Sequence, residues 1–245
     1  MSTSLVVPWQ CPPKTVLVGV DFGEASARAL AIAGVVASAF DARLRALHAE
    51  RFEPPPYFTL DQIARLEAER RVSQAAATDH LARFAAGASG YRVEPIVADE
   101  PPVDAILRGA ATADLIALGT HGRRGPGRWW LGSVAERVVR AAAIPVFVTR
   151  AAATPPRDVF ERIAIVQDGS DATGAALTCA RLLASIAGGS LIEGGPVTQC
   201  EAAVRQRASL VVVAARSGRS SWGITDSVAD VLGACQRPVL FIPVR

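Results

Sequence analysis

Runs of apolar, mostly β-branched residues alternate with alanine-rich segments along the first 150 residues of the chain. The run TVLVGV at residues 15–20 predicts a strand that ends at Asp21, and residues 26–39 place apolar side chains at helical spacing. Further strands are predicted at residues 43–49, 92–98, 115–118 and 145–149, and further helices at residues 61–86, 103–111 and 133–142. Such alternation favours an α/β fold with a parallel sheet covered on both faces.

The same pattern begins again after residues 151–157, which read as a linker because they contain AAATPP. Residues 162–166 predict the next strand. Three segments of the second half match the first: IAIVQDGSDAT matches VLVGVDFGEAS, SLVVVAARS matches DLIALGTHG, and DSVADVLGACQRPVLFIPVR matches GSVAERVVRAAAIPVFVTR. We therefore predict two domains, residues 1–150 and 158–245.

The second copy is shorter than the first. From Asp21 to Gly119 there are 98 positions, whereas from Asp168 to the equivalent Ala214 there are 46, so 52 are missing. We expect the loss to cover the second strand, the long helix and the third strand. Residues 187–195 then form a glycine-rich remnant of that region.

Charge, hydropathy and cysteine spacing argue against several classes of protein. The formal net charge is +3 and the arginines are spread along the chain, so nucleic-acid binding is not expected. Apolar runs such as residues 210–215 are far shorter than a membrane span of about 20 residues. The first residues lack the pattern of an export signal. Together these two features predict a cytoplasmic protein. The cysteines, Cys11, Cys179, Cys200 and Cys235, form no CxxC pair, which argues against a zinc site or a disulfide framework and predicts reduced thiols.

The glycine-rich segment GTHGRRGPGRWWLGSV, residues 119–134, lies between a predicted strand and a predicted helix. Two residues separate Gly119 from Gly122, and nine separate Gly122 from Gly132. Glycines admit backbone conformations and a close ligand approach that a side chain would block. The helix that begins at Ser133 directs unsatisfied backbone N–H groups at this loop, which suits a triphosphate. The Ser133 hydroxyl could donate to a phosphate or cap the helix, and both alternatives stay open.

This segment, with its continuation AERVV, resembles the ATP-binding loop of the universal stress proteins, whose nucleotide-binding members carry G-x2-G-x9-G-[ST]. The resemblance extends to VLVGVDFGEAS at the first strand, LHAE at the end of the second and IPVFVTR at the fifth. It covers residues 14–150 and, in reduced form, residues 162–245. It implies two doubly wound, Rossmann-like domains related to the adenine-nucleotide α-hydrolases, the second of them truncated.

The resemblance also implies a set of ligand contacts. Asp21 is expected to meet the adenosine part of ATP, and the backbone of Ala49, after His48, to contact the adenine. The phosphates are expected at the end of the fourth strand, on the loop and on the helix that follows: Leu118, Gly119, Gly122, Arg123, Gly132, Ser133 and Val134. Asp21 has an alternative role as a turn or helix-capping residue. Gly23 stands where the family often has serine, which weakens one local hydrogen bond.

Other side chains of the loop are expected to have structural roles. His121 has no partner acid or nucleophile at a recognisable spacing, so we expect it to shape the loop and assign no catalytic residue. Among the loop arginines, only Arg123 is expected to meet a phosphate. Trp129 and Trp130 are expected to pack under the loop, with a partner surface as the alternative.

The second copy lacks the glycines of the loop. Ala214, Ser217 and Asp226 stand at the equivalent positions, and a carboxylate at a helix N-terminus would repel a phosphate. Asp168 is retained but would bind nothing alone. We expect the second domain to be a folded support without its own nucleotide site.

These features predict an ATP-binding regulatory protein of the stress response with one site, in the first domain; AMP or ADP are alternative ligands, and Mg²⁺ would arrive with the nucleotide. The sequence has no Walker A lysine and no recognisable nucleophile–base pair, so we expect binding with at most slow hydrolysis. A nucleotide-independent dimerisation or adaptor module is the alternative, and an adenylating transferase would need catalytic groups near the loop. The fifth strands, PVFVTR and PVLFIPVR, are expected to pair in an intramolecular pseudo-dimer, and the chain could also form a homodimer.

Overall fold

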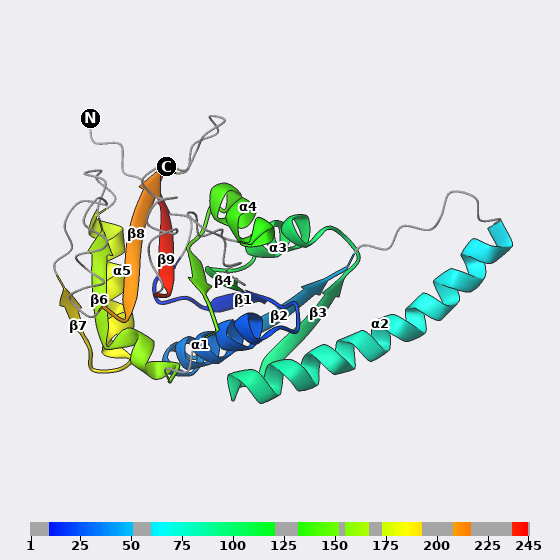
Figure 1. Cartoon of the computed structure of the whole chain (residues 1–245), viewed down its shortest axis with the longest axis horizontal. Coiled ribbons are helices and arrows are strands. Elements are labelled where there is room, and N and C mark those ends of the chain that lie inside the picture. Colours follow the sequence, from blue (N-terminus) through cyan, green and yellow to red (C-terminus); the bar gives the residue numbers. More distant parts are fainter. Residues whose placement is uncertain are drawn as a thin grey trace, which may run out of the picture.

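The computed structural model describes residues 10–50, 60–120, 132–151, 155–166, 173–192, 208–216 and 237–244. Within these residues the chain has an α/β fold built on one nine-stranded, mostly parallel sheet (Figure 1). The elements are, in chain order, β1 (Thr15–Gly19), α1 (Glu24–Phe40), β2 (Arg43–Ala49), α2 (Leu60–Ser89), β3 (Val93–Ala98), α3 (Pro102–Ala110), β4 (Leu115–Gly119), α4 (Ser133–Ala141), β5 (Val146–Thr149), the 3-10 helix η1 (Arg157–Phe160), β6 (Arg162–Val166), α5 (Thr173–Ser185), β7 (Ser190–Ile192), β8 (Leu210–Arg216) and β9 (Val239–Val244).

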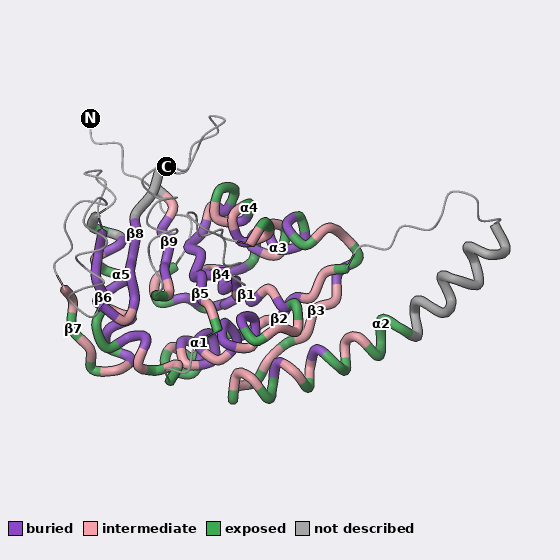
Figure 2. The backbone as a smooth tube through the Cα atoms, in the orientation of Figure 1, coloured by how far each residue is buried: buried purple, intermediate pink, exposed green. Residues whose placement is uncertain are grey.

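The first half has the strand order β3-β2-β1-β4-β5, and all of these strands run parallel. In Figure 1, α1 and α2 cover one face of these strands and α3 and α4 cover the other. Both faces are therefore buried, which is why the central strands are almost continuously apolar. Figure 2 shows the same burial along β1, β4 and β5, and every residue of β5 is buried.

Backbone and packing requirements explain where the helices begin and end. Asp41 adopts a left-handed conformation after α1, and its backbone N–H bonds to the carbonyl of Ala37, which closes the helix. Pro102 occupies the first turn of α3, where a missing N–H costs nothing. The last turns of α2 are held to the sheet by Leu81 and Ala85, both fully buried. Among the described residues, no helix is long and apolar enough to cross a membrane.

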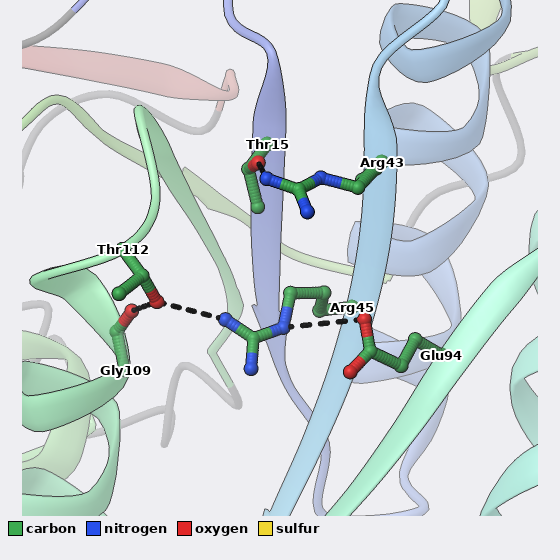
Figure 3. Close-up of polar contacts among 6 residues, drawn as sticks. All are labelled: Thr15, Arg43, Arg45, Glu94, Gly109 and Thr112. Atoms are coloured by element: carbon green, nitrogen blue, oxygen red, sulfur yellow. Dashed lines mark hydrogen bonds and ion pairs between the residues drawn. The ribbon is translucent and has the colours of Figure 1, made fainter.

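Polar contacts tie the strands together at the end of the sheet where β1 and β2 begin (Figure 3). Arg43 Nη2 donates a hydrogen bond to Thr15 Oγ1 at 3.2 Å, which links β2 to β1. Arg45 Nη1 donates to Thr112 Oγ1 at 2.9 Å, and its Nε lies 3.6 Å from a carboxylate oxygen of Glu94. The Glu94 side chain is 60% exposed, so this ion pair contributes little stability.

The expectation that the second half lacks its second strand is wrong. β7 pairs in parallel with β6, as β2 pairs with β1, although it has only three residues. The reason lies in the glycine-rich remnant: Gly188 has a φ of 62°, which turns the chain out of α5. Gly189 N then donates to Ala184 O at 2.8 Å, and Ser190 N donates to Glu161 O at 2.8 Å, which starts the new strand beside β6. Within the described residues the sheet ends at β7.

The two halves join through their last strands. β5 and β9 pair antiparallel, with Phe147 opposite Leu240 in the register. The strand order continues as β9-β8-β6-β7, so the second half repeats the order of the first in reverse. Val239, Leu240 and Phe241 are at most 3% exposed, so an apolar core crosses this seam.

Candidate functional site

A cavity of about 160 Å³ opens where β1, β2 and β4 end. β1 lies between β2 and β4, so the chain connections leave it in opposite directions, and the crevice at such a switch point is the usual ligand site of an open α/β sheet. Apolar side chains from β2, β4 and α3, including Leu47, Leu118 and Ile106, form much of the wall. Five of the sequence-predicted site residues line it together: Asp21, Ala49, Leu118, Gly119 and Val134.

Asp21 lies at the turn between β1 and α1, where its side chain stabilises the turn and also forms part of the cavity wall. Its Oδ1 accepts a hydrogen bond from the backbone N–H of Gly23 at 2.9 Å. This hydrogen bond gives Asp21 the turn role that sequence analysis named as an alternative to ligand contact. The helix cap is Gly23, which provides no side-chain capping bond. Asp21 is exposed, so a ligand in the cavity can reach its carboxylate.

Gly119, the last residue of β4, is a glycine for a packing reason. A Cβ placed there would lie 2.2 Å from the carbonyl carbon of Ala25 and 2.4 Å from the backbone nitrogen of Ser26. The first turn of α1 therefore rests directly on the end of β4. This contact brings α1 to the edge of the cavity and requires glycine whether or not a ligand is bound.

Gly132 is different, because no described residue crowds a side chain placed there. Its nearest neighbour among the described residues would be Thr120 Oγ1, at an ordinary contact distance of 3.5 Å from an added Cβ. Gly132 is the N-cap of α4, and its backbone N–H donates to that same Thr120 oxygen at 3.0 Å. The structure shows no side-chain capping bond at this helix. The capping role proposed for Ser133 is therefore not found: Ser133 is exposed and is the first residue of the helix.

The start of α4 faces the cavity with the backbone N–H groups of its first turn. The first hydrogen bond within the helix runs from Glu136 N to Gly132 O at 3.0 Å, so the N–H groups of residues 133–135 have no acceptor inside the helix. Val134 and Ala135 line the cavity. N–H groups without an acceptor inside the helix and the positive end of the helix dipole favour a negatively charged group at this place.

An aromatic cluster that sequence analysis did not identify lies beside the site. Phe22, next to Asp21, has a φ of 61°, which is rare for a bulky side chain. Its ring centroid lies 4.6 Å from that of His48, 4.7 Å from that of His80 and 5.3 Å from that of Phe84. His48 Nδ1 in turn donates to the carbonyl of Val20 at 2.8 Å. The turn after β1 is therefore held from α2 and β2, elements whose aromatic residues have no recognisable spacing in the sequence.

Comparison with known proteins identifies the family. The model of the universal stress protein family matches residues 13–150, which is more than half of the chain. The chain belongs to the universal stress protein family. A universal stress protein of Thermus aquaticus, described as lying in the QAH/OAS sulfhydrylase 3′ region, is 33% identical over 139 residues, or 56% of this chain and 98% of that protein.

Two further relatives extend the comparison to longer proteins. Universal stress protein Rv2005c of Mycobacterium tuberculosis is 32% identical over 139 residues, which is 55% of this chain but only 45% of that protein. The crystal structure of a universal stress protein from Archaeoglobus fulgidus DSM 4304 gives a TM-score of 0.72 over 94% of this chain and 98% of that chain, at 18% identity. At this identity the likeness concerns the fold, and it spans both halves of the sheet.

Several predicted residues of this universal stress protein lie outside the described residues. These are the loop residues Gly122, Arg123, His121, Trp129 and Trp130, and the second-half residues Asp168, Ser217 and Asp226. Ala214, which sequence analysis aligned with Gly119, lies in β8 opposite Ile242 of β9. Within the part of the chain that the structure describes, no three His, Cys, Asp or Glu residues cluster as metal ligands.

Proposed function

We propose that the first half of this universal stress protein binds one adenine nucleotide, ATP with its Mg²⁺, and that nucleotide occupancy regulates a partner surface. The observation that carries the proposal is the start of α4, where the N–H groups of residues 133–135 have no acceptor inside the helix and Val134 and Ala135 line the cavity at the β1/β4 switch point. The apolar wall suits an adenine ring, and the helix N-terminus suits phosphates.

The proposed contacts follow the geometry of the cavity. The Asp21 carboxylate accepts a hydrogen bond from the adenosine part, and the backbone at the end of β2, at Ala49, meets the adenine. The phosphates lie at the start of α4, on Gly132, Ser133 and Val134, beside the Leu118–Gly119 end of β4. Gly122 and Arg123 complete the phosphate contacts in this proposal. In this proposal the Mg²⁺ is held mainly by phosphate oxygens and water.

The reversed strand order supports a tandem arrangement of two domains, residues 1–150 and 158–245, packed as an intramolecular pseudo-dimer through β5 and β9. The second domain carries Asp226 where the first has Gly132, so it is proposed to support the first without binding nucleotide. The protein acts by binding, with hydrolysis slow at most.

The alternative function is a nucleotide-independent adaptor with the same fold. The packing of α1 on Gly119 favours it, because that loop glycine is needed even without a ligand. In this alternative, binding of a protein partner is unchanged when the start of α4 is altered.

Isothermal titration of nucleotide-stripped protein with Mg-ATP tests the proposal on the wild type and on Gly132→Asp. A carboxylate about 5 Å from one phosphate charge, at an effective dielectric constant of about 20, costs about 3 kcal/mol. This corresponds to roughly 200-fold weaker binding. AMP and ADP are titrated in the same way to rank the ligands.

The matched control is Gly174→Asp. Gly174 is exposed in the first turn of α5, and no atom of the described part of the chain lies within 4 Å of a Cβ placed there. The proposal expects one site per chain, with binding weakened roughly 200-fold by the Gly132 change and unchanged in the control. A folded wild type that gives no binding heat would favour the adaptor, and equal binding by both variants would place the nucleotide elsewhere.

A further inference from the structure

Cys11 and Cys179 are 168 positions apart in the sequence, yet both line one small cavity at the seam between the two halves. The cavity measures about 20 Å³ and is almost entirely apolar. Phe147 of β5 belongs to its first-half wall, and Phe160 of η1 and Leu240 of β9 belong to its second-half wall. The two cysteines therefore meet from opposite halves of the molecule.

The position of Cys11 is set by Asp114, which precedes β4. One carboxylate oxygen of Asp114 accepts hydrogen bonds from the backbone N–H of Lys14 at 2.9 Å and of Thr15 at 3.0 Å. The other accepts one from Gln10 N at 3.4 Å. These bonds lie on both sides of Cys11 in the chain, so they hold the segment that carries it against the first half.

Cys179 is fixed from the other side of the seam. It lies on α5, is 6% exposed, and belongs to the same apolar core as Phe160 and Leu183. Cys11 is only partly buried. The pair therefore combines one thiol that a small reagent can reach with one that is enclosed. Both thiols are free in the structure.

The two thiols interact directly, and the interaction makes them chemically different. Side-chain hydrogen bonding with Cys179 lowers the pKa of Cys11. The same interaction, together with burial, raises the pKa of Cys179 well above its ordinary value. Both directions fit a Cys179 S–H group that donates to a Cys11 thiolate. Since the thiolate is the nucleophile, Cys11 is the thiol that reacts first.

We propose that Cys11 and Cys179 form a reversible disulfide when the protein meets a peroxide, and that this bond locks the two halves together across the seam. The Cys11 thiolate attacks one peroxide oxygen, the O–O bond breaks, and hydroxide leaves and takes up a proton to give water. Cys11 is then a sulfenic acid. The Cys179 sulfur attacks the Cys11 sulfur, the S–S bond forms, the S–O bond breaks, and the hydroxyl leaves with the Cys179 proton as a second water. The two thiols are oxidised, the peroxide is reduced, and a dithiol reductant reverses the bond.

The crosslink has a stabilising consequence because it closes a very long loop. A disulfide limits the unfolded chain more as the enclosed loop lengthens. The oxidised protein is therefore expected to melt roughly 5–15 °C above the reduced protein. Adding a reductant is expected to return the melting temperature to its starting value.

Peptide mapping of the full chain tests the proposal. The protein is reduced, freed of reductant, exposed to hydrogen peroxide, alkylated and digested with trypsin without reduction. The expected product joins the peptide of residues 1–14, which holds Cys11, to the peptide of residues 163–181, which holds Cys179. Cys200 and Cys235 fall in two other tryptic peptides, so every alternative pairing gives a different mass.

Three variants sharpen the test. A Cys200→Ser/Cys235→Ser double variant keeps the proposed pair and is expected to form the crosslink and show the full rise in melting temperature. Cys179→Ala is expected to accumulate a sulfenic acid on Cys11, which dimedone traps, and Cys11→Ser is expected to show neither product. If Cys179→Ala fails to fold, the peptide map of the wild type still decides. Disulfides that join Cys200 or Cys235, crosslinks only between chains, or a reduced pair after peroxide treatment would each overturn the proposal.

Discussion

Replacing Gly119 by alanine tests whether α1 rests on the end of β4 as the structure places it. The added Cβ would lie 2.2 Å from the carbonyl carbon of Ala25, whereas ordinary van der Waals contact begins at 3.4 Å. The obstacle is backbone, so the start of α1 must move by about 1.2 Å or the strand must shift by as much. Overpacking of this kind costs about 1–3 kcal/mol. For a chain of this length, the melting temperature is expected to fall by roughly 2–12 °C.

The assay is thermal unfolding of nucleotide-free protein, followed by circular dichroism, with Gly132→Ala as the matched control. At Gly132 the added Cβ would meet, among the described residues, only Thr120 Oγ1 at 3.5 Å, so the melting temperature is expected to change by less than about 2 °C. The two alanines should thus differ in stability although both belong to the same glycine motif. If Gly119→Ala melts together with Gly132→Ala and the wild type, the close approach of α1 to β4 does not exist in solution.

Two further changes probe the hydrogen bonds between Asp114 and the segment before β1, and the pairing of β5 with β9 at the seam. Asp114→Ala removes the acceptor of the backbone N–H groups of Lys14 and Thr15. We expect it to lower the free energy of unfolding, measured by urea denaturation, by about 2–3 kcal/mol. An unchanged denaturation midpoint would show that these hydrogen bonds are not formed. Deleting residues 237–245 removes β9 and uncovers the apolar edges of β5 and β8, so we expect aggregation in size-exclusion chromatography. A soluble, monodisperse truncated protein would contradict the seam described above.

Much of the fold follows from local pattern. The strands at residues 43–49 and 162–166 were predicted with the bounds that the structure has. In the second of these, the residues after Arg162 form a continuous buried apolar run. In the first, the buried residues are Leu44, Ala46 and Leu47, between polar side chains. β7 was missed because a strand of three residues, one exposed and two half-buried, gives no periodic signal, and the 46 positions from Asp168 to Ala214 predicted that the second strand is lost. The strand exists because Gly188 can turn left-handed after α5.

The candidate site could be predicted only in part. Asp21, Ala49, Gly119 and Val134 line one cavity because parallel strands end at the same edge of a sheet, which follows from topology alone. The packing reason for Gly119 could not be predicted, because it depends on where α1 comes to lie. The Phe22 cluster and the Cys11–Cys179 pair were also missed, since contacts between distant positions leave no spacing pattern in a single sequence.

The antiparallel pairing of β5 with β9 also affects how the two halves can diverge. In a dimer of identical chains, each substitution occurs twice, and the interface must stay complementary to itself. Here the facing residues belong to one chain and already differ, as Val146 faces Phe241 and Phe147 faces Leu240. One half can therefore change sequence, shorten and lose a ligand loop while the other stays intact, and dilution cannot separate them. Because the two halves are covalently linked, the two ends of the sheet can differ from each other, which two identical chains cannot achieve.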